Sequence, residues 1–257
     1  MAADHPFALQ GPAQIIAHRG YSARAPENTI SALSLALDHG ATAVEFDVHS
    51  AGDGTPVLLH DATLDRTTSG RGPVTDYSAA ELSSLDAGSW FGPEFAGEPV
   101  PSLEDTLVEI KARISCIFAE LKGVRDIGDV AAIVALSRSA ELGDRTIFIS
   151  MDWALLDEIR RCDPEARIGL IVHEPALIDP ALARAQGDPH CLLDFDAGIL
   201  LARPEVAARA RNSGIALAAW TVDEVHQAEQ LFAMGVPRIT TNEVTRLLAW
   251  AKSLEER

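Results

Sequence analysis

Short apolar runs alternate with amphipathic stretches along almost the whole chain. Runs of about four to eight residues rich in Val, Ile, Leu and Ala are typical of strands buried on both faces. Longer stretches with apolar residues three or four positions apart are typical of helices with one buried face. The pattern predicts strands at residues 14–18, 43–49, 114–121, 145–150, 167–172, 191–195, 216–222 and 238–241. It predicts helices at residues 29–39, 102–111, 127–142, 152–161, 204–213, 223–234 and 243–252.

The order of these elements indicates parallel strands joined by helical crossovers. Eight strands in 257 residues predict an α/β fold of the TIM (β/α)8 barrel type, formed by a single domain over residues 1–257. A doubly wound open sheet is the alternative architecture with a similar order of elements. The number of repeats and the chain length favour the barrel.

Residues 61–101 interrupt this alternation. They are rich in Gly, Ser, Thr and Pro, and they hold one helix-like stretch at 78–85 and an aromatic segment at 90–95. The segment follows the apolar run 57–59, and we predict a small insertion that lies over the mouth of the barrel, where loops shape substrate access. The alternative is a surface excursion with a small aromatic core of its own.

Charged side chains stand near the carboxyl ends of three predicted strands. Glu45 and Asp47 share one face of their strand, because strand side chains alternate. In a barrel these strand ends form one rim, so Glu120 would join them. Three clustered carboxylates repel one another unless a cation lies between them, and their oxygens suit a divalent ion such as Mg²⁺ or Ca²⁺. Glu45 and Asp47 alone would rather indicate a solvated strand face, but Glu120 and Lys122 in another apolar strand favour a metal site.

Two histidines and two basic residues lie beside these carboxylates in the predicted rim. His18 and His60 each follow an apolar run, and imidazoles titrate near neutral pH, as a general acid and a general base require. Arg19 and Lys122 would neutralise phosphate oxygens. Trp220 is either core filling or an apolar wall against a substrate. The sequence has no glycine-rich phosphate loop, Gly-x-Ser-x-Gly motif or Cys-x-x-Cys motif that would indicate another chemistry.

The composition narrows the range of partners. Thirty-eight acidic and 21 basic side chains give a formal net charge of −17. Such a surface repels nucleic acids and anionic lipid headgroups, so we expect neither as a partner. No apolar run approaches the roughly 20 residues of a membrane span, so we expect no stable membrane insertion. The first residues lack signal-peptide features and the three cysteines do not suggest a disulfide framework, so we expect a cytoplasmic protein.

A series of short motifs runs in order along nearly the whole chain. They are His18–Arg19–Gly20, Pro26–Glu27–Asn28–Thr29, Glu45–Phe46–Asp47, Asp53–Gly54, His60–Asp61, Arg66–Thr67–Thr68, Pro101–Ser102–Leu103–Glu104, Glu120–Leu121–Lys122 and Trp220–Thr221–Val222. In this combination and order, the chain resembles the glycerophosphodiester phosphodiesterase family.

The resemblance implies a TIM barrel with a small insertion, and metal-dependent hydrolysis of a glycerophosphodiester to sn-glycerol 3-phosphate and an alcohol. By position, the resemblance implies that His18 and His60 are the acid–base pair and that Glu45, Asp47 and Glu120 hold Mg²⁺ or Ca²⁺. It also implies that Arg19 and Lys122 contact phosphate and that Trp220 lines the glycerol side. The expected partner is a small-molecule glycerophosphodiester, and the sequence indicates no particular oligomeric state.

Two positions depart from the family pattern. Residues 240–243 read Thr-Thr-Asn-Glu where relatives usually have Thr-Asp followed by an aromatic residue and Pro, which affects the rim at the last strand. Residues 50–52 replace a typical Thr-Lys pair in a surface turn. Two other functions are compatible with these motifs. One is a lysophospholipase D-like phosphodiesterase, which would need a more apolar entrance at 90–95, and the other is a non-catalytic barrel that binds a phosphorylated ligand.

Overall fold

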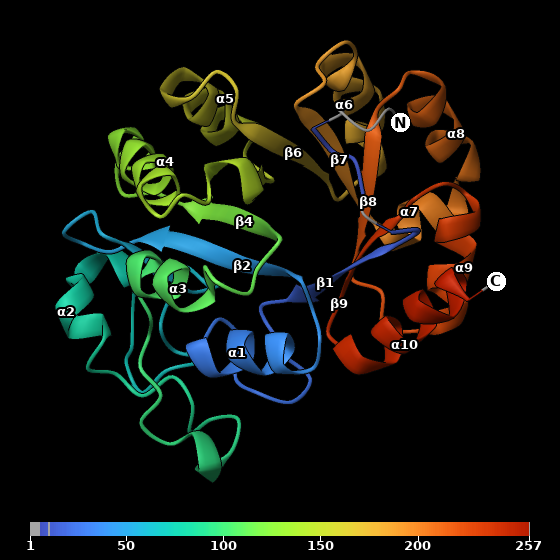
Figure 1. Cartoon of the computed structure of the whole chain (residues 1–257). Helices are drawn as coiled ribbons and strands as arrows, with labels where there is room; N and C mark the ends of the chain where they lie inside the picture. Colours follow the sequence, from blue (N-terminus) through green and yellow to red (C-terminus); the bar gives the residue numbers. More distant parts are fainter. Residues whose placement is uncertain (1–5, 10, 257) are drawn as a thin grey trace.

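Eight parallel strands close into a barrel within residues 6–9 and 11–256, which a computed structural model of the chain describes (Figure 1). The barrel strands are β1 (Gln14–His18), β2 (Ala43–Ser50), β4 (Cys116–Gly123), β5 (Thr146–Ser150), β6 (Arg167–Val172), β7 (Cys191–Asp196), β8 (Ala216–Trp220) and β9 (Arg238–Thr241). Strand β1 pairs with both β2 and β9, which closes the ring. The predicted TIM-like (β/α)8 barrel is therefore confirmed, and the open sheet is wrong because an open sheet keeps two unpaired edges.

Helices surround the strands on the outside of the barrel (Figure 1). They are α1 (Ile30–Asp38), α3 (Leu103–Ile110), α4 (Val130–Ser139), α5 (Trp153–Cys162), α6 (Ile178–Ala185), α7 (Ala197–Ala202), α8 (Pro204–Asn212), α9 (Val225–Ala233) and α10 (Val244–Glu255). Thr29 and Ser102 accept hydrogen bonds from backbone N–H groups at the starts of α1 and α3, which explains where these helices begin. No helix of the described residues is long and apolar enough to cross a bilayer.

The alternation of side chains along β2 separates the core from the interior of the barrel. Val44, Phe46 and Val48 belong to the large core between the strands and the helices. Ala43 belongs to the smaller cluster inside the barrel. Residues 45 and 47 share the face of Ala43, so the carboxylates at these positions point into the barrel.

Helices α6 and α7 were not predicted from the sequence. In α6, Pro180 is the third residue, which a helix tolerates because the backbone N–H groups of its first turn have no partner within the helix. Ile178, Ala181, Leu182 and Ala185 then bury one face of α6. The short α7 is capped by Asp196, whose side chain accepts a hydrogen bond from the Ile199 backbone.

The insertion at 61–101 packs beside β2 and α1. It is preceded by β3 (Pro56–Leu58), which pairs antiparallel with β2, and it contains α2 (Ala79–Leu82). Its buried side chains Leu64, Val74, Leu82, Ala87 and Val100 form a separate aliphatic cluster with Ala51, Val57 and Leu59, which precede the insertion. Trp90, Phe91 and Phe95 make edge-to-face contacts with ring centroids 5.6 Å apart, and Trp90 is 42% exposed. The small core of the insertion is therefore mainly aliphatic rather than aromatic.

Candidate active site

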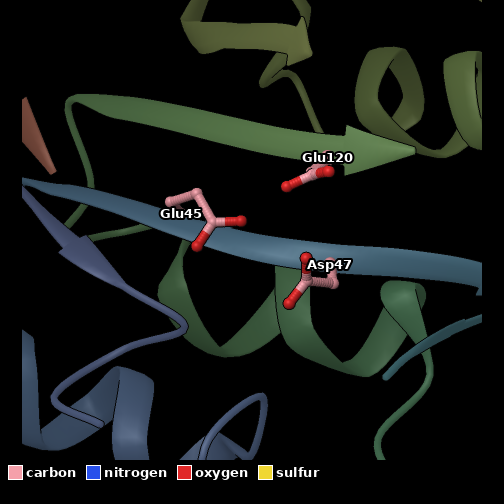
Figure 2. A group of neighbouring side chains, drawn as sticks. All are labelled: Glu45, Asp47 and Glu120. Atoms are coloured by element: carbon pink, nitrogen blue, oxygen red, sulfur yellow. The ribbon is translucent and has the colours of Figure 1, made fainter. Parts of the chain in front are cut away.

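Three carboxylates converge inside the barrel near the carboxyl ends of two neighbouring strands. Glu45 and Asp47 come from β2 and Glu120 comes from β4, where Asp47 and Glu120 are direct partners in the strand register (Figure 2). Each residue offers an oxygen, and these oxygens lie within 4.8 Å of one another. The sequence-predicted metal ligands are thus brought together, and we call these three residues the carboxylate group.

The carboxylate group carries an electrostatic conflict. Burial, followed by repulsion from Asp47 and Glu120, raises the pKa of Glu45 well above its usual range. Burial and the charge of Asp47 raise the pKa of Glu120 to about 7. Among the described residues, Glu45 Oε1 and Asp47 Oδ1 are buried without a hydrogen-bond partner. Oxygen donors that lack partners and repel one another fit a hard divalent cation, so this group could hold a metal ion.

Arg19 and Lys122 contact the carboxylate group directly. The Arg19 backbone N–H donates to Glu45 Oε2 at 2.9 Å, and its side-chain Nε lies 3.2 Å from Asp47 Oδ2. Lys122 Nζ donates to Glu120 Oε1 at 2.9 Å and lies 3.8 Å from Asp47 Oδ1. Two cations and three carboxylates therefore share one small volume, and a divalent ion bound there would give it the positive charge that a phosphate requires.

The loop after β1 holds Arg19 in an unusual backbone conformation. Its φ is +55°, in the left-handed region that non-glycine residues rarely occupy. Gly20 follows with a φ of +81°, and a Cβ atom there would lie 2.5 Å from the Ala32 backbone. Glycine is therefore required for the loop to pack against α1, which explains the third position of the His-Arg-Gly motif.

His18 is held by a neutral amide. His18 Nδ1 lies 2.7 Å from Asn242 Oδ1, and Asn242 Nδ2 donates to Asp223 Oδ2 at 2.9 Å. Because the amide nitrogen faces Asp223, the amide oxygen faces His18 and accepts a hydrogen bond from the Nδ1–H group. The lone pair then lies on Nε2, which is 3.9 Å from Glu45 Oε2. Burial, and next the charge of Arg19, lower the pKa of His18 to about 4, which keeps the imidazole neutral.

His60 is held by a carboxylate instead. Its Nδ1 lies 2.6 Å from Asp61 Oδ1, and Arg66 donates to both oxygens of Asp61 at 2.6 and 3.0 Å. The hydrogen bond from Arg66 holds the pKa of Asp61 well below its usual range. Arg66 also donates to Glu27 at 2.8 and 2.9 Å, and Glu27 accepts from Arg19 at 2.8 Å. An unbroken series of charged contacts thus joins His60 to Arg19.

The Pro-Glu-Asn-Thr motif supplies supporting contacts that the sequence analysis did not assign. Glu27 joins Arg19 to Arg66, as described above. Asn28 Nδ2 donates to Asp47 Oδ2 at 2.7 Å, and its Oδ1 accepts from the Asp47 backbone at 3.0 Å. Asn28 also has a positive φ of +58°. The motif itself was the available signal, but the partner of each side chain depends on the tertiary structure.

The pocket beside the carboxylate group has both polar and apolar walls. It is lined by His18, Arg19, Glu45, His60, Glu120, Lys122, Ile149, Met151, Ile171, Asp194, Trp220 and Thr240. Seven of the eight sequence-predicted site residues therefore line one pocket, and the eighth, Asp47, lies in the carboxylate group. Sequence reasoning missed Asp194, for which no motif gave a signal, and Asn242, which it identified only as a departure. A larger cavity of about 570 Å³ lies at the opposite end of the barrel, where β1, β6 and β9 begin.

Comparisons with known proteins show what the chain is similar to as a whole. Residues 18–246 match the model of the glycerophosphoryl diester phosphodiesterase family. A glycerophosphodiester phosphodiesterase of Caldanaerobacter subterraneus is 33% identical over 236 residues, which cover 91% of this chain and 96% of that protein. A phosphodiesterase of Oleispira antarctica, solved in complex with the product sn-glycerol-3-phosphate, superposes with a TM-score of 0.84 at 29% identity, covering 93% of this chain and 96% of the other. A glycerophosphodiester phosphodiesterase of Agrobacterium tumefaciens gives a TM-score of 0.78 at 29% identity, covering 91% and 98%.

The family match covers most of the chain and includes every predicted site residue. The chain is therefore a phosphodiester hydrolase that belongs to the glycerophosphoryl diester phosphodiesterase family.

Proposed function

We propose that the protein hydrolyses glycerophosphodiesters to sn-glycerol 3-phosphate and an alcohol, with Mg²⁺ or Ca²⁺ bound by Glu45, Asp47 and Glu120. One observation carries this proposal: the imidazoles of His18 and His60 line the pocket beside the carboxylate group, and their hydrogen-bond partners differ. The product bound to the Oleispira antarctica phosphodiesterase supports glycerol 3-phosphate as the product here.

We assign different roles to the two histidines because their environments differ. His18 is neutral and has its lone pair on Nε2, so it accepts the proton of the attacking hydroxyl group. His60 donates a proton to the oxygen of the departing alcohol, and Asp61 stabilises its positive charge. The attacking hydroxyl belongs either to water or to the glycerol C2 of the substrate, and the second route forms a cyclic phosphate before water opens it.

The basic side chains and Trp220 bind and orient the substrate. Arg19 and Lys122 lie beside the carboxylate group, where they neutralise non-bridging phosphate oxygens. A divalent ion bound there would polarise a phosphoryl oxygen and offset negative charge in the transition state. Trp220 provides an apolar wall for the carbon atoms of glycerol.

A panel of substrates tests the reaction. Glycerophosphocholine, glycerophosphoethanolamine and a lysophospholipid are each incubated with the protein and Mg²⁺ or Ca²⁺, and the products are identified by ³¹P NMR. We expect glycerol 3-phosphate from the first two substrates. Choline phosphate instead of glycerol 3-phosphate would show that the other P–O bond breaks. Turnover of the lysophospholipid alone would support the lysophospholipase D-like alternative, and no turnover of any diester would support a non-catalytic binding barrel.

Two further parts of the proposal concern the position of the insertion at residues 61–101 and the cellular location of the protein. We propose that residues 61–101 border the mouth of the barrel, since Arg66 of this segment contacts Glu27 next to the site. We also propose a cytoplasmic location, which the three free cysteines support because thiols persist in reducing compartments. Fractionation of cells that express the protein tests the location directly.

A further inference from the structure

One acidic side chain of the pocket takes part in none of the contacts described above. Asp194 lies on β7 two positions after Leu192, and both side chains point into the barrel because strand residues alternate. Asp194 is 2% exposed and lines the pocket. Among the described residues, its Oδ1 is buried and has no hydrogen-bond partner. A buried polar group without a partner destabilises a fold, so its position at the active site requires an explanation.

The neighbours of Asp194 cannot satisfy its carboxyl group. Its partners in the strand register are Ile171 on β6 and Ala218 on β8, which have apolar side chains. Trp220 follows Ala218 on the same face of β8, and within the described residues its indole Nε1 also has no hydrogen-bond partner. The adjacent strands β7 and β8 therefore each place one polar group beside the pocket, Asp194 Oδ1 and Trp220 Nε1. Neither group has a hydrogen-bond partner among the described residues.

Asp194 and Trp220 lie on the side of the barrel opposite the carboxylate group. In the ring of strands, β5 and β6 separate β4 from β7, and β1 and β9 separate β2 from β8. Strands β7 and β8 therefore lie opposite β2 and β4. A substrate whose phosphate lies against Arg19 and the carboxylate group would extend across the barrel toward Asp194.

We infer that Asp194 is a specificity residue, which hydrogen-bonds the glycerol hydroxyl group that is remote from phosphorus in the substrate. This inference rests on the proposed function. Burial, and next the charge of Glu120, raise the pKa of Asp194 to about 8, so its neutral form predominates at neutral pH. A neutral carboxyl group both donates and accepts a hydrogen bond, as an alcohol does. The bound hydroxyl would satisfy Asp194 Oδ1, which has no hydrogen-bond partner among the described residues.

Two other roles for Asp194 are less well supported. In the part of the chain that the structure describes, the residues whose oxygens lie within 4.8 Å of one another are Glu45, Asp47 and Glu120, without Asp194. A fourth metal ligand is therefore not favoured. A neutral carboxyl group also provides no charge for a cationic headgroup such as choline.

The test measures kcat/KM for two substrates with the wild-type protein and with the variants Asp194→Leu and Asp194→Asn. One substrate is a glycerophosphodiester, and the other is the matched diester in which propane-1,2-diol replaces glycerol, so that only the hydroxyl remote from phosphorus is absent. We expect the wild-type protein to prefer the glycerol substrate by at least about tenfold in kcat/KM, because a site built for a hydroxyl rejects its absence. Asp194→Leu should reduce this preference to less than about threefold, and Asp194→Asn should retain most of it because an amide also donates and accepts.

Stability provides an independent measurement. Asp194→Leu should raise the Tm of the free protein by about 2 °C or more, since it removes an unpartnered buried polar group. Asp179→Asn is the matched control, because Asp179 is an exposed carboxylate of α6 that contacts Arg209, and it should keep the wild-type preference. Asp194→Ala replaces the leucine variant if leucine does not fold.

The outcomes separate this inference from the proposed function. An unchanged substrate preference in the leucine and alanine variants would overturn the role of Asp194, and so would loss of Mg²⁺ binding in Asp194→Asn measured by calorimetry. A change in choline preference without a change in hydroxyl preference would also overturn it. If the wild-type protein hydrolyses neither diester, the proposed function fails, and calorimetric binding of sn-glycerol 3-phosphate and of propanediol phosphate then tests Asp194 by itself.

Discussion

His18 and Asn242 are 224 positions apart in the chain, and His18 Nδ1 lies 2.7 Å from Asn242 Oδ1. Asp223 orients the amide from its other side through a hydrogen bond of 2.9 Å. This pair of contacts selects the tautomer of His18 that a general base requires, because Nδ1 carries the proton and Nε2 faces the carboxylate group.

Replacing the side-chain amide of Asn242 should therefore lower kcat much more than it changes KM. Asn242→Leu removes the acceptor for His18 Nδ1, and we expect kcat to fall about 10- to 100-fold with a KM change of less than about threefold. Asn242→Asp retains an acceptor and should keep more activity than the leucine variant. Steady-state kinetics on glycerophosphocholine provide the measurement, and equal losses of kcat in both variants would contradict the role in orientation.

The two histidines should respond differently to the leaving group. His18→Ala and His60→Ala should each lower kcat by about 10²- to 10⁴-fold with an alkyl leaving group. A p-nitrophenyl diester needs no proton on its leaving group, so it should restore much of the activity of His60→Ala and little of that of His18→Ala. Equal rescue of both variants would reverse or remove the assigned roles, and near wild-type turnover in either variant would exclude that histidine from catalysis.

Divalent ions should stabilise the protein more at high pH than at low pH. The pKa of Glu120 rises from its usual 4.5 to about 7 in the folded protein, so the folded state holds more protons than the unfolded state between these values. Without a metal ion, the contribution of Glu120 to stability is therefore present below about 4.5 and decreases as the pH rises through about 7. We expect the increase in Tm on adding Mg²⁺ or Ca²⁺ to be larger at pH 8 than at pH 5, and activity to be lost after exhaustive chelation. Activity that survives chelation, or a Tm that is insensitive to these ions at pH 8, would contradict the metal site.

Arg66 should be required for activity although it belongs to the insertion. It donates to Asp61 and Glu27, which contact His60 and Arg19 respectively. Arg66→Met should lower kcat by about tenfold or more, and Arg66→Lys should restore only part of it, because an ammonium group cannot make paired contacts with both carboxylates. The matched control is Arg71→Met in the same segment, since the Arg71 side chain is 90% exposed and its ion pair with Asp65 is 3.9 Å long. Equal activity of the two methionine variants would show that the connection between His60 and Arg19 has no catalytic role.

The local pattern of the sequence was sufficient for the barrel and for most of the site. Alternating side chains placed Glu45 and Asp47 on one face of β2, and the rule that parallel strands share a carboxyl end brought Glu120 to them. Both arguments use only the spacing of residues and the geometry of a strand. The same reasoning did not predict α6, a helix whose third residue is Pro180 and whose buried face is formed by Ile178, Ala181, Leu182 and Ala185.

The partners of the catalytic side chains depended on the tertiary structure. The sequence indicated that residue 242 departs from the family, but closure of the barrel between β1 and β9 places its amide against His18. Asp194 carries no motif, and its missing partner became evident only when Ile171 and Ala218 were found on either side of it. The reason is physical: spacing along one strand decides which face a side chain occupies, whereas its charge state and hydrogen bonds depend on groups from strands that only the closed barrel brings near.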